Sequence, residues 1–560
     1  MRSFSVFRPF QSYSGQTSKR SGGKDESFDS TDPQDILSED HVWLEVPDEL
    51  QFVHVEDPYA EQFETIVEDA YDIGECSQSS FAPEDTWVAE EQSSATIDEG
   101  PYVEAAELHD TSSSVDPVTS RLATLYLIKH YKEGPGTWFD IFDTGCYFSG
   151  KVPVKAATSP LLKSSICAIS AKHLLRLNKT QTSQNHCLDP RWRGYDWLYE
   201  SAKHYSEAIR HLKTAVDLQT YENDLSEKED MLAAVAILCI YELMDAPGTA
   251  WRAHLSALPL FKPTENVSHP ATPVVIPRTA IQGPILWSLA RQDLLCAFIS
   301  ETQTRLDLKD VRLWQNAGLA TTEDGTLMPF SPLCSADIRT SADIEEDTKS
   351  NELTWLIGKL SNHLTSGDAI NPTDYALPLG QRPPIGVTQE RLLERWKMLM
   401  AEFKKWYESL PTTFTPYART PYPYTPRSCF NSFEQIWYEL PICAATMQNY
   451  HMAMILLLVN QPQESTFVRS TVSARLNSYR RVQKDVHVHA REICGVGLAD
   501  PSEPVRANSV QALFVAGQVF YKKDEQDAVL ELLSDIERDL GWTTRFHRAK
   551  LVDEWPDNSV

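Results

Sequence analysis

The sequence has no closely spaced cysteines. Its ten cysteines are spread over 560 residues, and no two lie closer together than 14 residues. This spacing excludes Cys-x-x-Cys metal motifs and gives no indication of a disulfide framework. Cys167, Cys239 and Cys296 stand inside apolar helical patterns. We therefore predict that these cysteines are free and buried as small hydrophobic residues, as in a reducing compartment.

Long hydrophobic runs are also lacking. The longest, "MLAAVAILCIY" (231–241) and "MAMILLLV" (452–459), fall short of the roughly 20 residues that span a bilayer. Residues 1–20 contain four basic residues and no acid, but no apolar signal-peptide core. Their composition also fits a mitochondrial presequence, which is the less favoured alternative. We expect a soluble intracellular protein that makes no contact with a membrane.

Basic residues are almost missing from one segment. Residues 21–120 contain 28 acidic residues and a single base, Lys24. Residues 121–560 contain 51 acidic and 46 basic residues, so this part carries only −5 of the total net charge of −28. An imbalance confined to one segment predicts a domain boundary near residue 117.

The acidic segment has the composition of a disordered interaction region. Residues 1–24 are predicted to be a basic, Ser-rich, disordered leader. Residues 25–116 are predicted to be a disordered segment in which aromatic and aliphatic residues alternate with acids. Mutual repulsion keeps such a chain extended and its aromatic side chains accessible to a partner groove. Residues 25–116 are therefore a candidate activation region that recruits coactivators. The alternative is a passive acidic linker.

Helical periodicity begins near residue 117 and continues to the end of the chain. Ser159 is suited to a helix N-cap and Pro160 to the first helical position. One apolar stripe follows at helical spacing, formed by Leu162, Ile166, Ile169 and Leu174. Ser226 and Glu229 have the spacing of a capping box at the start of another helix, which ends before Pro247-Gly248.

Further helices are expected near 196–217, 280–300, 352–366, 388–408, 474–498, 504–522 and 524–540. Residues 432–462 form a long helix with a kink at Pro441, or two helices. Pro-rich or polar loops are expected at 262–284, 320–350 and 409–428, and convincing strand alternation is absent. The predicted fold class is all-α, with a multi-helix domain over residues 117–560.

The common catalytic motifs are absent as well. The sequence has no GxSxG elbow, HExxH box or GxxxxGK[ST] loop, and its helical histidines stand singly. Glu242, Asp245 and His254 lie close together in the sequence and raise the alternatives of a metal site or a structural hairpin. A helical metal bundle needs a Glu-x-x-His pair on facing helices, and none is repeated here. We therefore expect a structural role and no catalytic, cofactor-binding or metal-ligating residue.

Asp245 is expected to need a partner. It stands near the C-terminal end of its helix, where a carboxylate is unfavourable to the helix dipole. Arg252, Arg291 or His254 could supply the balancing contact.

Several segments, taken in order, resemble the fungal-specific transcription factor domain, the regulatory region of fungal zinc-cluster transcription factors. "YELMDAPGTAWRAHL" (241–255) is similar to its Tyr-Glu-x-x-Asp … His-Leu hairpin, and "WSLARQDLLCAFISETQTRLDL" (287–308) to its Arg-Gln-Asp helix. "SPLLKSSICAISAKHLLRLN" (159–178) resembles its early helix, and later pieces as far as "LVDEW" follow in the family's order. The resemblance covers about residues 120–556.

Two departures from the family pattern matter. Ala257 stands where the family's hairpin often has a Gly, so we expect a local shift there. The zinc cluster that normally precedes the domain needs six cysteines, but the first 145 residues contain only Cys76. Zinc is therefore expected only with a cluster missing from this sequence.

The resemblance implies a pathway-specific transcription regulator in the nucleus, which is not an enzyme. DNA binding would come from the missing zinc cluster or from a partner protein, and a homo- or heterodimer and a small-molecule effector remain open. The alternative from another class is a helical enzyme or ligand-binding protein with a pocket in the helix bundle.

We predict that the purified chain alone does not bind DNA specifically at physiological salt. A net charge of −5 over residues 121–560, preceded by the acidic segment, repels phosphate. A gel shift with random genomic fragments tests this, and the same chain fused to an unrelated zinc-cluster domain is the positive control. A shifted band that survives competition by random DNA would contradict the prediction.

Overall fold

A computed structural model describes most of the chain from residue 117 onward. The described residues are 117–180, 192, 195–219, 225–245, 254–255, 258, 282–300, 302–322, 325–328, 341–365, 389–426, 428–462 and 472–555. The leader 1–24, the acidic segment 25–116 and the turn at 246–253 lie outside them. Their predicted properties, disorder among them, stay predictions.

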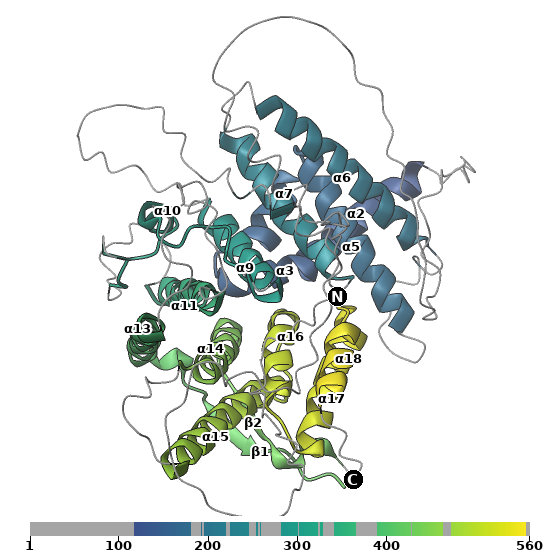
Figure 1. The fold of residues 1–560 in the computed structure, drawn as a ribbon. Helices are drawn as coiled ribbons and strands as arrows, with labels where there is room; N and C mark the ends of the chain where they lie inside the picture. Colours follow the sequence, from purple (N-terminus) through teal and green to yellow (C-terminus); the bar gives the residue numbers. More distant parts are fainter. Residues whose placement is uncertain are drawn as a thin grey trace, which may run out of the picture. The chain divides into compact units, whose positions relative to one another are not determined.

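The first helices gather around one long central helix, α5 (Figure 1). α5 contacts α2, α6 and α7 along its length. The stripe predicted from the sequence is confirmed, because Leu162, Ile166, Ile169 and Leu174 are all completely buried. The bounds are α2 Pro117–Glu133, α3 Pro135–Phe139, η1 Asp140–Phe142, η2 Tyr147–Lys151, α4 Val152–Lys155, α5 Pro160–Thr180, α6 Trp197–Gln219 and α7 Leu225–Leu243.

The start of α7 differs from the sequence prediction. The helix begins at Leu225, one residue before Ser226. The Glu229 carboxylate accepts a hydrogen bond from the Tyr147 hydroxyl at 2.7 Å and pairs with the Lys155 ammonium at 3.1 Å, while the Ser226 side chain lies outside the described part of the chain. Glu229 therefore ties α7 to the η2–α4 segment.

The middle helices connect the α5 group to the rest of the fold. α9 contacts both α7 and α11, and α11 contacts α13 and α14. The bounds are α9 Gln282–Ser300, α10 Val311–Asn316, α11 Ser341–Thr365 and α13 Gln389–Glu408. The predicted loop over 320–350 is wrong in its second half, since α11 begins at Ser341 and not near 352.

Buried polar pairs explain why α11 starts early. The Lys349 ammonium and the Glu352 carboxylate are both almost fully buried and lie 3.0 Å apart. The Ser350 hydroxyl hydrogen-bonds the Thr446 hydroxyl of α14 at 2.7 Å. A helix face that pairs polar groups in the interior looks like a polar loop in a hydropathy pattern.

Two short antiparallel strands precede the last helices. β1, Ala418–Pro421, pairs with β2, Glu434–Trp437, in the register Ala418 to Trp437. α14 begins at Pro441, which occupies the first helical position. The prediction of a kink at Pro441 within one long helix is therefore wrong. Proline suits the first position of a helix, because a backbone N–H at that position would have no partner within the helix.

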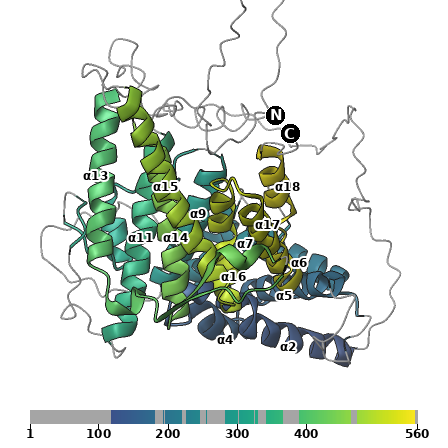
Figure 2. The same ribbon diagram turned by 90° about the horizontal axis from the view of Figure 1, so that it is seen from below.

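α14 is the most buried helix of the C-terminal half. It contacts α11, α15 and α16 (Figure 2). Its length and composition would allow it to cross a membrane, but most of it is buried among other helices, as in a protein core. The remaining bounds are η6 Thr412–Phe414, η7 Cys429–Ser432, α14 Pro441–Val459, α15 Val472–Gly497, α16 Glu503–Gly517, α17 Lys523–Leu540 and α18 Arg545–Glu554.

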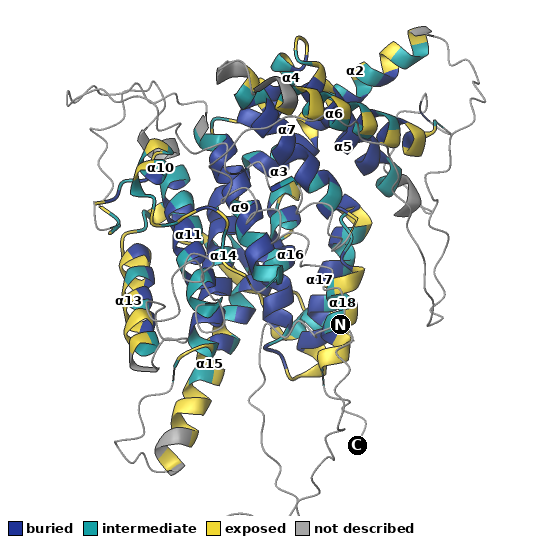
Figure 3. Ribbon diagram, turned by 45° about the horizontal axis from the view of Figure 1, so that its top comes forward, coloured by how far each residue is buried: buried dark blue, intermediate teal, exposed yellow. Residues whose placement is uncertain are grey.

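One continuous hydrophobic core runs through the described helices. Figure 3 shows buried residues concentrated on α5, α9, α14 and α16, and exposed residues along the outer end of α15. Apart from the two short strands, the described residues with regular structure are helical, which confirms the all-α prediction. Cys167, Cys239 and Cys296 are free and buried, as predicted.

A buried histidine pair lies where α2 meets α5. The His130 Nε2 and His173 Nδ1 atoms are 3.0 Å apart, and the Trp138 ring meets the edge of His173 at 5.0 Å between centroids. Burial lowers the pKa of His130 to about 4 and lowers the pKa of His173 as well. Both rings are therefore neutral in the folded protein at pH 7.

This pair makes the fold sensitive to acid. Because the folded pKa is depressed, the unfolded state binds more protons between pH 6.5 and about pH 4, and stability falls as the pH falls through this window. We predict that His130→Phe/His173→Phe loses about 2–4 kcal/mol less stability between pH 7 and pH 5 than the parent, about 2 kcal/mol for each histidine. Urea unfolding at both pH values measures the difference. Equal losses in parent and variant would contradict the prediction.

Candidate functional site

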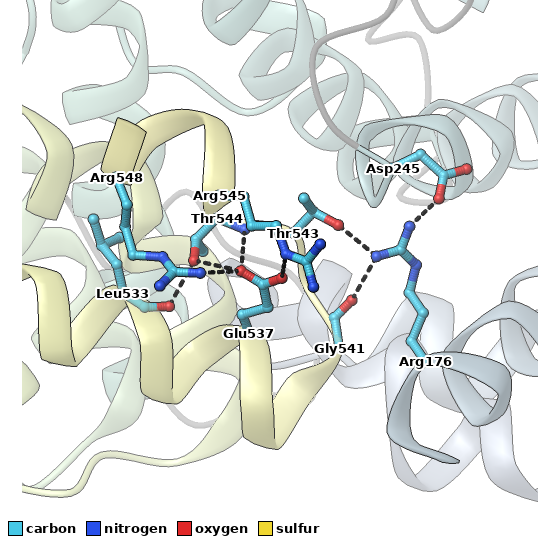
Figure 4. Close-up of polar contacts among 9 residues, drawn as sticks. All are labelled: Arg176, Asp245, Leu533, Glu537, Gly541, Thr543, Thr544, Arg545 and Arg548. Carbon is cyan, nitrogen blue, oxygen red and sulfur yellow. Dashed lines mark hydrogen bonds and ion pairs between the residues drawn. The ribbon is translucent and has the colours of Figure 1, made fainter. Parts of the chain in front are cut away.

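The C-terminal end of α7 forms an ionic junction with α5. The Asp245 carboxylate, 51% exposed, pairs with the Lys172 ammonium through one oxygen and with the Arg176 guanidinium through the other (Figure 4 draws the second contact). These partners correct the expectation from the sequence. Arg291 hydrogen-bonds the Asn351 side chain at 2.6 Å, and Arg252 lies outside the described residues.

Lys172 is the buried half of this junction. Its side chain is only 7% exposed, and its ammonium donates to the Tyr241 carbonyl at 2.6 Å and lies 3.6 Å from the centroid of the Tyr241 ring. Burial lowers the pKa of Lys172, and the Asp245 carboxylate opposes that shift. The carboxylate thus compensates a cation that is otherwise poorly solvated.

Arg176 extends the junction to the end of the chain. Its guanidinium also donates to the Gly541 carbonyl at 3.3 Å and to the Thr543 hydroxyl (Figure 4). Thr543 in turn donates its backbone N–H to the Met244 carbonyl at 3.4 Å. The turn between α17 and α18 is therefore fastened to both α5 and α7.

Gly541 allows this close approach. Its φ of +62° lies in the left-handed region, where glycine is favoured at a helix C-terminus. A Cβ added at this position would lie 2.7 Å from the Arg176 Cβ. Any other residue would push the α17–α18 turn away from α5.

Glu537 holds the same turn from the other side. Its carboxylate accepts from the Arg548 guanidinium at 2.8 Å, from the Arg545 Nε at 3.0 Å and from the Thr544 backbone at 3.3 Å. Burial alone would raise the pKa of Glu537, but these hydrogen bonds and the arginine charges hold it below its ordinary value. The turn thus keeps a fixed shape at neutral pH.

Glu242 and His254 do not join Asp245 in one ligand set. The Tyr205 hydroxyl of α6 donates to the Glu242 carboxylate, and burial together with this hydrogen bond raises the pKa of Tyr205. Burial lowers the pKa of His254, and the Glu242 charge acts in the opposite direction. Within the described part of the chain, no three His, Cys, Asp or Glu side chains are placed to hold a metal ion.

The Arg-Gln-Asp segment of α9 also serves packing contacts. The Gln292 side chain donates to the Ala236 carbonyl of α7 at 3.1 Å. The buried Asp293 carboxylate accepts from the Leu306 N–H at 2.9 Å and lies 3.6 Å from the Arg305 guanidinium. These motif residues fasten α9 to α7 and to the chain that follows it.

These contacts join segments that are far apart in the sequence, and the arrangement has the features of a structural junction. Sequence reasoning missed Lys172, Arg176, Gly541 and Thr543. One signal was available for the two bases, because residues four apart on a helix share a face and together attract a carboxylate.

We predict that Asp245→Ala lowers the free energy of unfolding by about 1–2 kcal/mol, since it leaves the Lys172 cation buried without a carboxylate. Asp245→Ala combined with Lys172→Met should recover part of this loss. Urea unfolding measures both, and Asp553→Ala, at an exposed position on α18, is the matched control. An Asp245→Ala variant as stable as the control would contradict the junction.

Comparison with known sequences agrees with this geometry. Residues 126–259, which include the C-terminal part of α2 and all of α5, α6 and α7, match the fungal specific transcription factor domain. The sequence is also 32% identical over 493 residues to the transcription activator AMTR1 of Alternaria alternata. That match covers 77% of this chain and 63% of AMTR1, so the chain spans less than two thirds of its relative's length.

No solved structure matches the chain significantly. The family match contains three residues of the ionic junction, Lys172, Arg176 and Asp245. The segments that resembled the family in the sequence analysis lie both inside this match and beyond it. Residues 126–259 of the chain therefore contain a fungal specific transcription factor domain.

Proposed function

We propose that the protein is a transcription activator of a fungal pathway, in which the helical region regulates and the acidic segment activates. The observation that carries the proposal is the family match over residues 126–259. The relative AMTR1 is named as a transcription activator, which supports activation of transcription as the role of this protein. The role is regulatory rather than enzymatic, and the protein acts in the nucleus.

The acidic segment supplies the proposed activation function. Residues 25–116 place aromatic and aliphatic side chains between acids, as in "DHVWLEVPDELQF" (40–52). In such a segment the acids keep the apolar side chains in water and steer them towards basic surfaces of coactivators. The apolar side chains then supply most of the contact area.

DNA contact is a separate part of the proposal. The zinc cluster typical of the family needs six cysteines, which this sequence does not contain within a short span. We assign DNA binding to such a cluster outside this sequence or to a partner protein. The helical region would then control the activity of the assembled factor.

The junction around Arg176 fits a regulatory role of the helical region. It joins helices of the family match to the α17–α18 turn, 365 residues further along the chain. A partner or effector that binds near either segment would change contacts at the other, because both depend on one guanidinium.

We predict that residues 25–116, fused to an unrelated DNA-binding domain, activate a reporter gene. Replacing Trp43, Leu44, Phe52 and Phe63 by Ala should abolish most of this activity, because the contact area is lost while net charge and length stay the same. Reporter output per unit of fusion protein is the measurement.

The matched control replaces four serines of the same segment by Ala: Ser77, Ser79, Ser80 and Ser93. This control also keeps charge and length, and it should activate like the parent. An inactive parent fusion, or an aromatic variant as active as the serine variant, would reduce the segment to a passive linker.

A further inference from the structure

Threonine–proline pairs cluster in one short stretch of the sequence. Six Ser-Pro or Thr-Pro pairs occur in the 560 residues, and three of them, at Thr415, Thr420 and Thr425, follow one another at intervals of five. The stretch 410–433 that contains them has no acidic residue, although the chain has 79. Neither the ionic junction nor the family match accounts for this pattern.

The structure presents the third pair at the tip of the β1–β2 hairpin, whose strand β2 contacts α15 and whose η7 segment contacts α17 (Figure 1). Residues 423–426 are all exposed, and the Tyr424 side chain is 81% exposed. The Asn431 side chain fixes the backbone of Thr425, since it accepts from the Thr425 N–H at 3.0 Å and donates to the Thr425 carbonyl at 2.8 Å. The tip is thus ordered and open to solvent.

The Thr425 hydroxyl is available for reaction. It donates to the Pro423 carbonyl at 3.4 Å, close to the upper limit for a hydrogen bond. Pro426 has no backbone N–H, and a residue before proline favours extended backbone. A protein kinase that requires proline after its acceptor recognises an exposed hydroxyl followed by a residue that lacks a backbone N–H.

The other two threonines are less well presented. Thr420 belongs to strand β1 and is paired with Gln435 of β2, which restricts its backbone. The Thr415 N–H is bonded to the Thr412 carbonyl in the turn after η6. Among the three, only Thr425 also has a proline two residues before it, at Pro423.

The pair Ser159-Pro160 has a structural role, because it forms the start of a helix. Ser159 immediately precedes α5 and is half-buried, and its carbonyl accepts the Lys163 N–H at 3.0 Å. A kinase cleft would have to unwind the first turn of α5 to reach this serine. At the hairpin tip the Thr425 carbonyl accepts from the Ser428 N–H at 3.1 Å and from the Asn431 side chain at 2.8 Å, so a kinase cleft has to open one turn there and no helix.

We propose that Thr425 is a phosphorylation site for a proline-directed protein kinase, with ATP as the phosphoryl donor. The Thr425 Oγ forms a bond to the γ-phosphorus of ATP, the bond from that phosphorus to the bridging oxygen of ADP breaks, and the hydroxyl proton passes to the carboxylate base of the kinase. The products are phosphothreonine and ADP, and no redox step is involved.

A phosphate would add charge to a stretch that has no acids of its own. Phosphothreonine carries about −1.5 to −2 charges at pH 7. Residues 410–433 contain no acid, whereas in the structure the Arg419 guanidinium is paired with Glu492 at 2.7 Å and the Cys429 thiol lies 3.3 Å from the Glu531 carboxylate of α17. This proposal concerns a covalent modification and does not depend on the proposed role in transcription.

The test uses the full-length purified chain, Mg²⁺-ATP and an active mitogen-activated protein kinase, which is proline-directed. We expect one phosphate per chain by intact mass, located on Thr425 by peptide mapping. Thr425→Val should abolish this phosphate, and Pro426→Ala, which keeps the hydroxyl, should abolish it as well. Thr420→Val is the matched control and should be labelled like the parent. A thermal unfolding curve establishes that each variant is folded.

Three results would overturn the proposal. The first is full labelling of Thr425→Val, which would place the phosphate on another residue. The second is full labelling of Pro426→Ala, which would remove the role of the proline. The third is a parent chain that is labelled after unfolding in urea but not when folded, because the hairpin would then hide the threonine.

Discussion

The position of the α7 end depends on one carboxylate that satisfies two cations of α5. Lys172 is buried and needs the Asp245 carboxylate to offset its lost hydration, whereas Arg176 is shared between that carboxylate and the α17–α18 turn. A lysine in place of Arg176 could not serve both sides, because only the planar guanidinium presents several donors in fixed directions. The Arg176 side chain is therefore one of the contacts that join the α5–α7 pair to the C-terminal helices, together with the Thr543 N–H and the close approach of Gly541 (Figure 4).

Local apolar periodicity made much of this fold predictable. The stripe from Leu162 to Leu174 marks α5, and the helices expected at 474–498 and 524–540 appear within two residues of their predicted ends, whereas the one expected from 432 begins only at Pro441. Such a stripe is predictable because the residues that form one buried helix face lie only three or four positions apart in the sequence. The free, buried cysteines followed from the same patterns.

Contacts between distant residues were not predictable in the same way. Asp245 meets Arg176 across 69 residues and lies beside a turn that begins at Gly541, so nothing near it in the sequence identifies its partners. The early start of α11 was hidden because the Lys349–Glu352 pair satisfies its charges inside the protein. Pro441 was ambiguous, since proline both starts and interrupts helices, and only the preceding strand decides between them.

The β1–β2 hairpin combines a fixed base with an exposed tip. At its base, Ile436 packs so closely on α15 that a Cβ added to Gly495 would lie 2.6 Å from its side chain. The Arg491 guanidinium donates to the Ser432 carbonyl and is itself held by the buried Glu525 carboxylate at 2.9 Å. The tip is held within itself by Asn431, and its η7 segment packs on α17, where the Cys429 thiol lies 3.3 Å from the Glu531 carboxylate. A charge added at Thr425 would therefore act on a surface that also includes α17.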